Sequence, residues 1–211
     1  MEVLEFKPIK NKIITVYMVK KAKQDEEINE RVNLNELLNF INADFVTFDL
    51  DNENMINLRK SSLRKLLDEL EIPYFPLEMP EYAKGYLFEE IMEKEEQINE
   101  LLEEYISMKD KNSFKGQNLK SWIDILKKEV EKKKNFLIYK LRPQWIVKKI
   151  LDQIKSKKKR DITIVHFVPK NIISEMIKLL QEYNVKVIIY ENKVSHLGSN
   201  LIKNKEEIKQ W

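Results

Sequence analysis

Asp49 and Asp51 are the residues whose types and spacing most clearly permit chemistry. They stand at the end of the run Phe45–Leu50, which is rich in aromatic and β-branched residues and is typical of a buried strand. Two carboxylates in this position offer the hard oxygen ligands that Mg²⁺ takes, and such a metal assists phosphoester hydrolysis. The same residues also suit a strand end that caps the next helix without any metal, so both interpretations stay open.

The string Phe-Val-Thr-Phe-Asp-Leu-Asp-Asn at residues 45–52 resembles the first motif of the haloacid dehalogenase-type phosphatases. The resemblance implies that Asp49 acts as the nucleophile and Asp51 as the general acid or base. Glu53 stands where that family prefers Thr or Val. The resemblance covers eight residues, and the chain is not assigned to the family on that basis.

Other polar residues are expected near the same edge of the sheet, because open α/β sheets bind ligands outside the carboxyl ends of their strands. Arg142 precedes Pro143 and either presents a guanidinium to an anion or simply marks a helix start. His166 lies in a predicted strand and is either a ligand-binding residue or a hydrogen-bonded core residue. Candidate ligand-binding residues at this edge are therefore Glu78, Arg142, His166 and Glu191.

A dense basic run precedes the strand predicted to begin at Ile162. Its candidate nucleic-acid contacts are Lys157, Lys158, Lys159 and Arg160, and the alternative is an ordinary solvated connection at the amino edge of the sheet. With three glycines, all scattered, the chain lacks the glycine-rich loops of dinucleotide enzymes and P-loop NTPases. The absence of cysteine also excludes disulfides and thiol chemistry.

Short strand-like runs alternate with helical patterns, which predicts an α/β fold with a mostly parallel sheet of five or six strands and helices on both faces. Helices are expected around residues 34–41, 55–70, 143–154 and 173–180. The predicted strands cover residues 13–19, 45–50, 72–75, 136–139, 162–168 and 185–190.

Residues 80–134 contain no strand signal and predict an inserted hairpin of two long helices. A coiled-coil-like seam of apolar residues runs along the first arm and is expected to face the second arm. A second stripe, offset by one position, must cover the sheet, a second copy of the chain or another protein. The seam includes Leu87, Ile91, Ile98 and Leu101, and the second stripe consists of Phe88, Met92, Leu102 and Ile106.

The two arms differ sharply in charge. Residues 81–110 carry 10 acidic and 3 basic side chains, whereas residues 111–160 carry 17 basic and 4 acidic side chains. Acidic and basic helices can pair within the hairpin, or the excess positive charge can face an acidic partner or nucleic acid. Over the whole chain the charges nearly cancel, at a formal net charge of +3.

These patterns divide the chain into the N-terminal half of an α/β domain (1–79), the hairpin (80–134), the C-terminal half (135–191) and a tail (192–211). No apolar run is long enough to span a membrane, and we expect a cytoplasmic protein. The leading hypothesis is a noncatalytic binding or scaffold domain that associates with itself or another protein through the hairpin. The alternative is a Mg²⁺-dependent phosphoester hydrolase that acts on a nucleotide or nucleic acid, so the sequence leaves open whether the chain is an enzyme.

Overall fold

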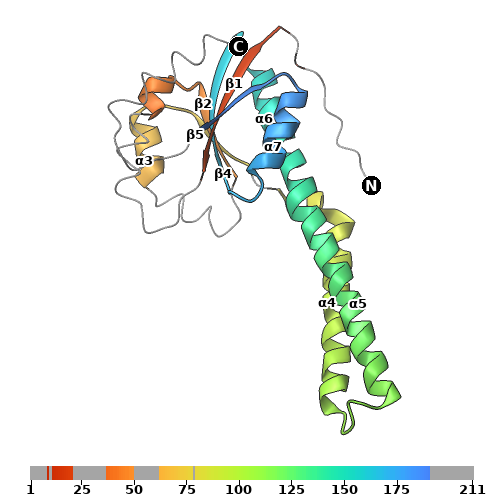
Figure 1. The fold of residues 1–211 in the computed structure, drawn as a ribbon. Helices are drawn as coiled ribbons and strands as arrows, with labels where there is room; N and C mark the ends of the chain where they lie inside the picture. Colours follow the sequence, from red (N-terminus) through yellow and green to blue (C-terminus); the bar gives the residue numbers. More distant parts are fainter. Residues whose placement is uncertain (1–8, 10, 21–36, 50–61, 78, 191–211) are drawn as a thin grey trace.

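A five-stranded, all-parallel sheet forms the centre of the computed structural model (Figure 1), which describes residues 9, 11–20, 37–49, 62–77 and 79–190. The sheet is thus of the α/β class that the alternating patterns predict. Its strand order is β3-β2-β4-β1-β5, so β4 lies between β1 and β2. The strands are β1 (Ile13–Lys20), β2 (Phe45–Asp49), β3 (Tyr74–Leu77), β4 (Asp161–Val168) and β5 (Lys186–Tyr190).

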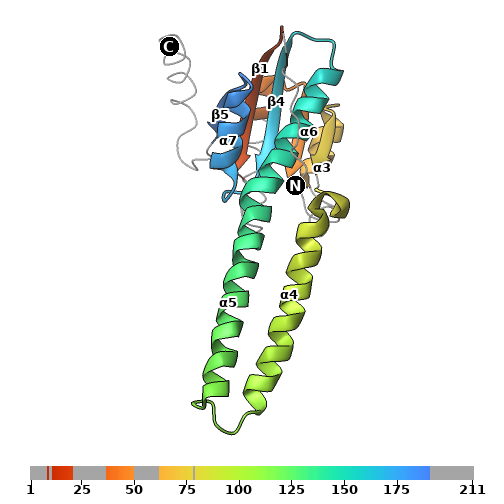
Figure 2. The same cartoon turned by 90° about the vertical axis from the view of Figure 1, so that its right-hand side faces the viewer.

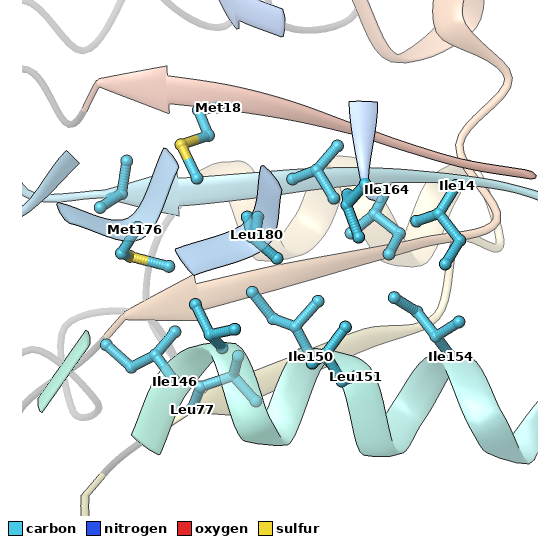
Figure 3. Packing of buried hydrophobic residues seen from close by; sticks show 14 of the residues in the cluster. Ile14, Met18, Leu77, Ile146, Ile150, Leu151, Ile154, Ile164, Met176 and Leu180 are labelled. Carbon is cyan, nitrogen blue, oxygen red and sulfur yellow. The ribbon is translucent and has the colours of Figure 1, made fainter. Parts of the chain in front are cut away.

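Two helices, α6 (Arg142–Ser156) and α7 (Ile173–Glu182), pack on one face of this sheet. Isoleucines of α6 recur at helical spacing and meet alternate residues of the strands, because side chains alternate between the two faces of a strand. Figure 3 shows this layer of apolar side chains between α6 and the sheet. Its members include Ile14, Met18, Ile146, Ile150, Ile154, Ile164, Met176 and Leu180.

A separate apolar cluster lies on the opposite face, beneath α3 (Ser62–Glu69) and the helical residues 37–41. The rings of Phe48 in β2 and Phe167 in β4 stack there with their centroids 5.1 Å apart. Leu66 and Leu67 of α3 are buried in the same cluster. The two clusters together explain why β2 and β4 are buried on both sides.

The helices α4 (Glu81–Ser107) and α5 (Phe114–Phe136) pair side by side and extend away from the sheet (Figure 2). Ile91 and Ile98 of α4 are buried against Ile123, Leu126 and Val130 of α5. This hairpin cluster is separate from both sheet clusters, so the two helices carry a small core of their own.

A left-handed residue kinks the start of α4. Gly85 has φ 47° and ψ −143°, a conformation that residues with a Cβ atom rarely adopt. The kink leaves the first turn, with Tyr82, beside Trp145 of α6, where the two rings meet edge to face at 6.1 Å. The kink at Gly85 therefore allows the first turn of α4, at the base of the hairpin, to contact α6 on the sheet.

The strand predicted at residues 136–139 is wrong. Phe136 ends α5, and residues Leu137–Leu141 form a π-helical turn, η2, that leads directly into α6. Leu137 packs in the hairpin cluster while Ile138 packs on the sheet cluster, so consecutive apolar residues serve two cores. The wider π turn also suits Pro143, which lacks the amide hydrogen that a regular helix would use.

Candidate functional site

The carboxylate of Asp49 lies at the carboxyl end of β2 and is 1% exposed. Arg142, the first residue of α6, donates to its Oδ1 from Nη2 at 2.7 Å and from Nε at 3.1 Å. The arginine side chain is 28% exposed, so the ion pair connects a buried carboxylate to the surface at the edge of the sheet. Two charge-assisted donors on one oxygen stabilise the ionised form of the aspartate.

A second polar contact joins β2 to β4 in the core. Thr47 and His166 are directly opposite in the parallel register, and both side chains are completely buried. Thr47 Oγ1 and His166 Nδ1 lie 2.8 Å apart and share a hydrogen bond. The position of His166 in a strand is compatible with either the core or the edge of the sheet, and the structure places it in the core.

Asp49, Thr47 and His166 share one face of the sheet. Because side chains alternate along a strand, Thr47 and Asp49 follow Phe45, and His166 follows Ile164, onto the face covered by α6 and α7. The structure thus brings together three of the candidate residues, Asp49, Arg142 and His166, in the same layer. Thr47 was not singled out from the sequence, since only the strand order reveals which residue faces His166.

Asp51, the second carboxylate of the predicted metal pair, lies outside the described residues, as do Glu78 and Glu191. Within the part of the chain that the structure describes, no three His, Asp or Glu side chains come close enough together to hold a metal ion. The described chemistry at this edge is therefore a carboxylate neutralised by a guanidinium.

The basic run lies at the opposite, amino edge of the sheet, just before β4. Lys159 pairs with Asp44 at 2.6 Å, and the ammonium of Lys157 lies over the rings of Phe45 and Phe75. Lys158 and Arg160 are exposed to solvent. Two of the four candidate nucleic-acid contacts thus have partners within the fold.

Apolar side chains along α4 differ in how far the hairpin covers them. Phe88 is 40%, Met92 52% and Ile106 68% exposed, whereas Leu102 is half-buried and packs against the hairpin cluster. On α5, Trp122 and Ile125 are also largely exposed. Their spacing of three residues places them on one side of the helix, and Trp122, which the apolar pattern of the second arm included, lies outside the hairpin cluster.

Ion pairs link the two arms of the hairpin along their length. Lys94 donates to Glu129 at 2.6 Å and Lys115 to Glu104 at 2.6 Å, and Lys133 and Lys134 pair with Glu90 and Glu95. The hydrogen bond and positive charge of Lys94 lower the pKa of Glu129. Some of the acidic side chains of α4 and basic side chains of α5 therefore neutralise each other within the hairpin.

Comparison of the chain with protein-family models, with curated proteins and with solved structures finds no match. Among the described helices, none combines the length and the apolar character needed to cross a membrane.

Proposed function

We propose that this protein is a noncatalytic binding or scaffold module whose inserted helical hairpin is its interaction element. The observation that carries the proposal is the exposure of Met92 and Ile106 on α4, which leaves large apolar side chains in water along an arm that reaches away from the sheet. Exposed apolar side chains grouped along one element are typical of a protein interaction surface.

Further burial of these side chains favours association. Complete burial of a fully exposed Met, Ile or Phe side chain contributes about 1.5 to 3 kcal/mol, and Phe88, Met92 and Ile106 are 40–68% exposed, so each can contribute part of that amount. In a symmetric dimer both copies contribute these side chains, so the gain from burial is doubled. This gain opposes the entropic cost of bringing two chains together. Self-association is therefore the form of binding that the chain can be tested for directly.

Replacement of both Met92 and Ile106 by Glu is expected to give a folded monomer, because charged side chains oppose burial at an interface yet tolerate an exposed helix surface. Sedimentation equilibrium at tens of micromolar measures the association, and circular dichroism checks the fold. The variant Asn118→Glu with Ser121→Glu adds the same charge at exposed positions of α5 and is the matched control. A wild-type protein that sediments as a monomer under these conditions contradicts self-association.

A Mg²⁺-dependent phosphoester hydrolase is the second candidate, because Asp49 lies at the carboxyl end of a parallel strand, where α/β enzymes place catalytic groups. Asp49 pairs with Arg142, and among the described residues no group of three His, Asp or Glu side chains gathers to hold a metal ion, which favours the binding module. Hydrolysis of nucleotide or nucleic-acid phosphoesters that requires Mg²⁺ and is abolished in Asp49→Asn would favour the enzyme. Inactivity of the wild type toward a broad panel of phosphoesters would count against it.

A further inference from the structure

We propose that the partner of the hairpin is a second copy of the chain, lying alongside with both sheets at the same end and α4 of each copy against α5 of the other. This inference rests on the proposed function and specifies its partner and geometry. It is carried by the positions of charged residues on one side of the hairpin, which we call the stripe side.

The ion pair between Glu95 and Lys134 identifies the residues of the stripe side. On α4, Phe88 stands seven residues before Glu95, Met92 three residues before it, and Ile106 eleven residues after it. These spacings return to the same side of a helix. On α5, Lys127 stands seven residues before Lys134, two helical turns away on the same side. The exposed apolar residues of α4 therefore lie next to a row of lysines on α5.

Two rows of opposite charge border this side, each with a spacing of seven residues. The lysine row consists of Lys120, Lys127 and Lys134, and the glutamate row follows the outer edge of the apolar stripe. The glutamate row consists of Glu89, Glu96 and Glu103. The glutamates stand one residue after Phe88, Glu95 and Leu102, and the lysines of α5 are interspersed with Asp124 and Glu131. All six side chains of the two rows are exposed.

The ion pairs within the hairpin show which residues of α4 and α5 lie at the same level. In the pairs Lys94–Glu129 and Glu90–Lys133, the residue numbers add to 223. The pairs Glu104–Lys115 and Glu95–Lys134 add to 219 and 229, so they are displaced by four residues in one direction and six in the other and bracket the same register. Each glutamate of the outer row also adds to 223 with one lysine: Glu89 with Lys134, Glu96 with Lys127 and Glu103 with Lys120.

A twofold axis parallel to the hairpin preserves this matched register. It places α4 of one copy against α5 of the other, and every residue keeps its height along the helix axis. Glu96 then faces the partner's Lys127, and the aliphatic stems of the lysines cover the apolar stripe while their ammonium groups reach the glutamates. Three such pairs form on each side of the axis.

The opposite arrangement, with the sheets at opposite ends, brings like charges together. A twofold axis perpendicular to the helices in the interface places α4 against α4, and α4 carries 9 acidic and 2 basic side chains. It also places α5 against α5, which carries 7 basic and 3 acidic side chains. Opposed like charges disfavour a wrong pairing, so the charge distribution selects the same-end arrangement.

Reversal of one charge tests the pairing. Glu96→Lys is expected to weaken self-association about tenfold or more, because the change is repeated at both symmetry-related sites, and Glu96→Lys with Lys127→Glu is expected to restore it. Glu96→Lys with Lys132→Glu carries the same charges but places the second change far around α5, and it should not restore association. Equal association of both double variants would overturn the proposed pairing.

Because the chain has no cysteine, one spin label at the hairpin tip reports the arrangement directly. Phe114 is 82% exposed at the start of α5, and Phe114→Cys carries the label. The same-end arrangement places the two labels within about 25 Å, since packed helices lie about 8–10 Å apart. The opposite arrangement separates them by about 40 Å, the length of a 27-residue helix.

The two measurements separate the possible failures. A wild-type protein that is monomeric and shows no dipolar coupling overturns both the self-association and its geometry. A dimer with labels about 40 Å apart overturns only the same-end arrangement and leaves the hairpin as the interaction element. A dimer that survives replacement of Met92 and Ile106 by Glu uses another surface, and it contradicts both proposals.

Discussion

Arg142 holds the carboxylate of Asp49 in the core by donating two hydrogen bonds to one of its oxygens. A buried ion pair contributes little when both charges are present, since removing them from water costs nearly as much as their attraction returns. Loss of one partner is more costly, because the remaining charge is left in an apolar layer. The pair therefore acts mainly as a constraint on where α6 begins against β2.

Arg142→Met is expected to destabilise the protein by about 2 to 4 kcal/mol, somewhat less than for a fully buried pair because the arginine is 28% exposed. Urea unfolding followed by circular dichroism measures this loss. The double variant Arg142→Met with Asp49→Leu should recover most of it, since the buried carboxylate is removed as well. If the stability loss of the double variant equals the sum of the losses of Arg142→Met and Asp49→Leu alone, the two side chains are not energetically coupled in the folded protein.

The sequence was sufficient to predict where Asp49 lies but not what it contacts. A buried run followed by a carboxylate predicts a strand end, and β2 does end at Asp49. Its partner Arg142 lies 93 residues further along the chain, and the predicted strand before it was wrong. Thr47 and His166 face each other because β2 and β4 are neighbours, which local residue patterns do not encode.

The hairpin is the element in which charge has its clearest local effect. Lys94 lies across from Glu129, and its hydrogen bond, then its positive charge, lower the pKa of that carboxyl group. The ionised glutamate therefore stabilises the paired helices. This contribution is fully present above the ordinary glutamate pKa and is lost as the pH falls through the lowered pKa of the folded protein.

Lys94→Met is expected to raise the pKa of Glu129 back toward its ordinary value, because both the donor and the nearby charge are removed. Titration of the Glu129 carboxyl carbon by NMR measures the shift directly. Lys148→Met removes a lysine from α6, away from the hairpin, and should leave the titration of Glu129 unchanged. An unchanged Glu129 titration in Lys94→Met would contradict the contact between the two arms.

Periodicity located most elements correctly and failed where one segment serves two cores. Five predicted strands correspond to β1–β5, with small differences at their ends. Residues 136–139 read as a strand because Phe136, Leu137, Ile138 and Tyr139 are consecutively apolar or aromatic. In the structure they continue a helix whose sides face the hairpin, the sheet and solvent in turn, and this has the same local composition as a strand.

At the scale of the whole molecule, the alternating patterns predicted the class of the sheet but not its strand order. Strands from the N-terminal and C-terminal halves of the chain are interleaved in the sheet. β4 lies between β1 and β2, and β5 pairs with β1. Strand order depends on contacts between segments more than 100 residues apart, and such contacts leave no periodic signature in either segment.

This interleaved order has a consequence for how the chain folds as it is synthesised. β1 pairs with β4 and β5, so this first strand of the described sheet has no partner there until residues beyond 160 have been made. β2 and β3, by contrast, can pair early, and the hairpin closes through contacts local in sequence. Assembly of the sheet must therefore wait for the insertion of its central strand, a late, nonlocal step that sets the pace of folding.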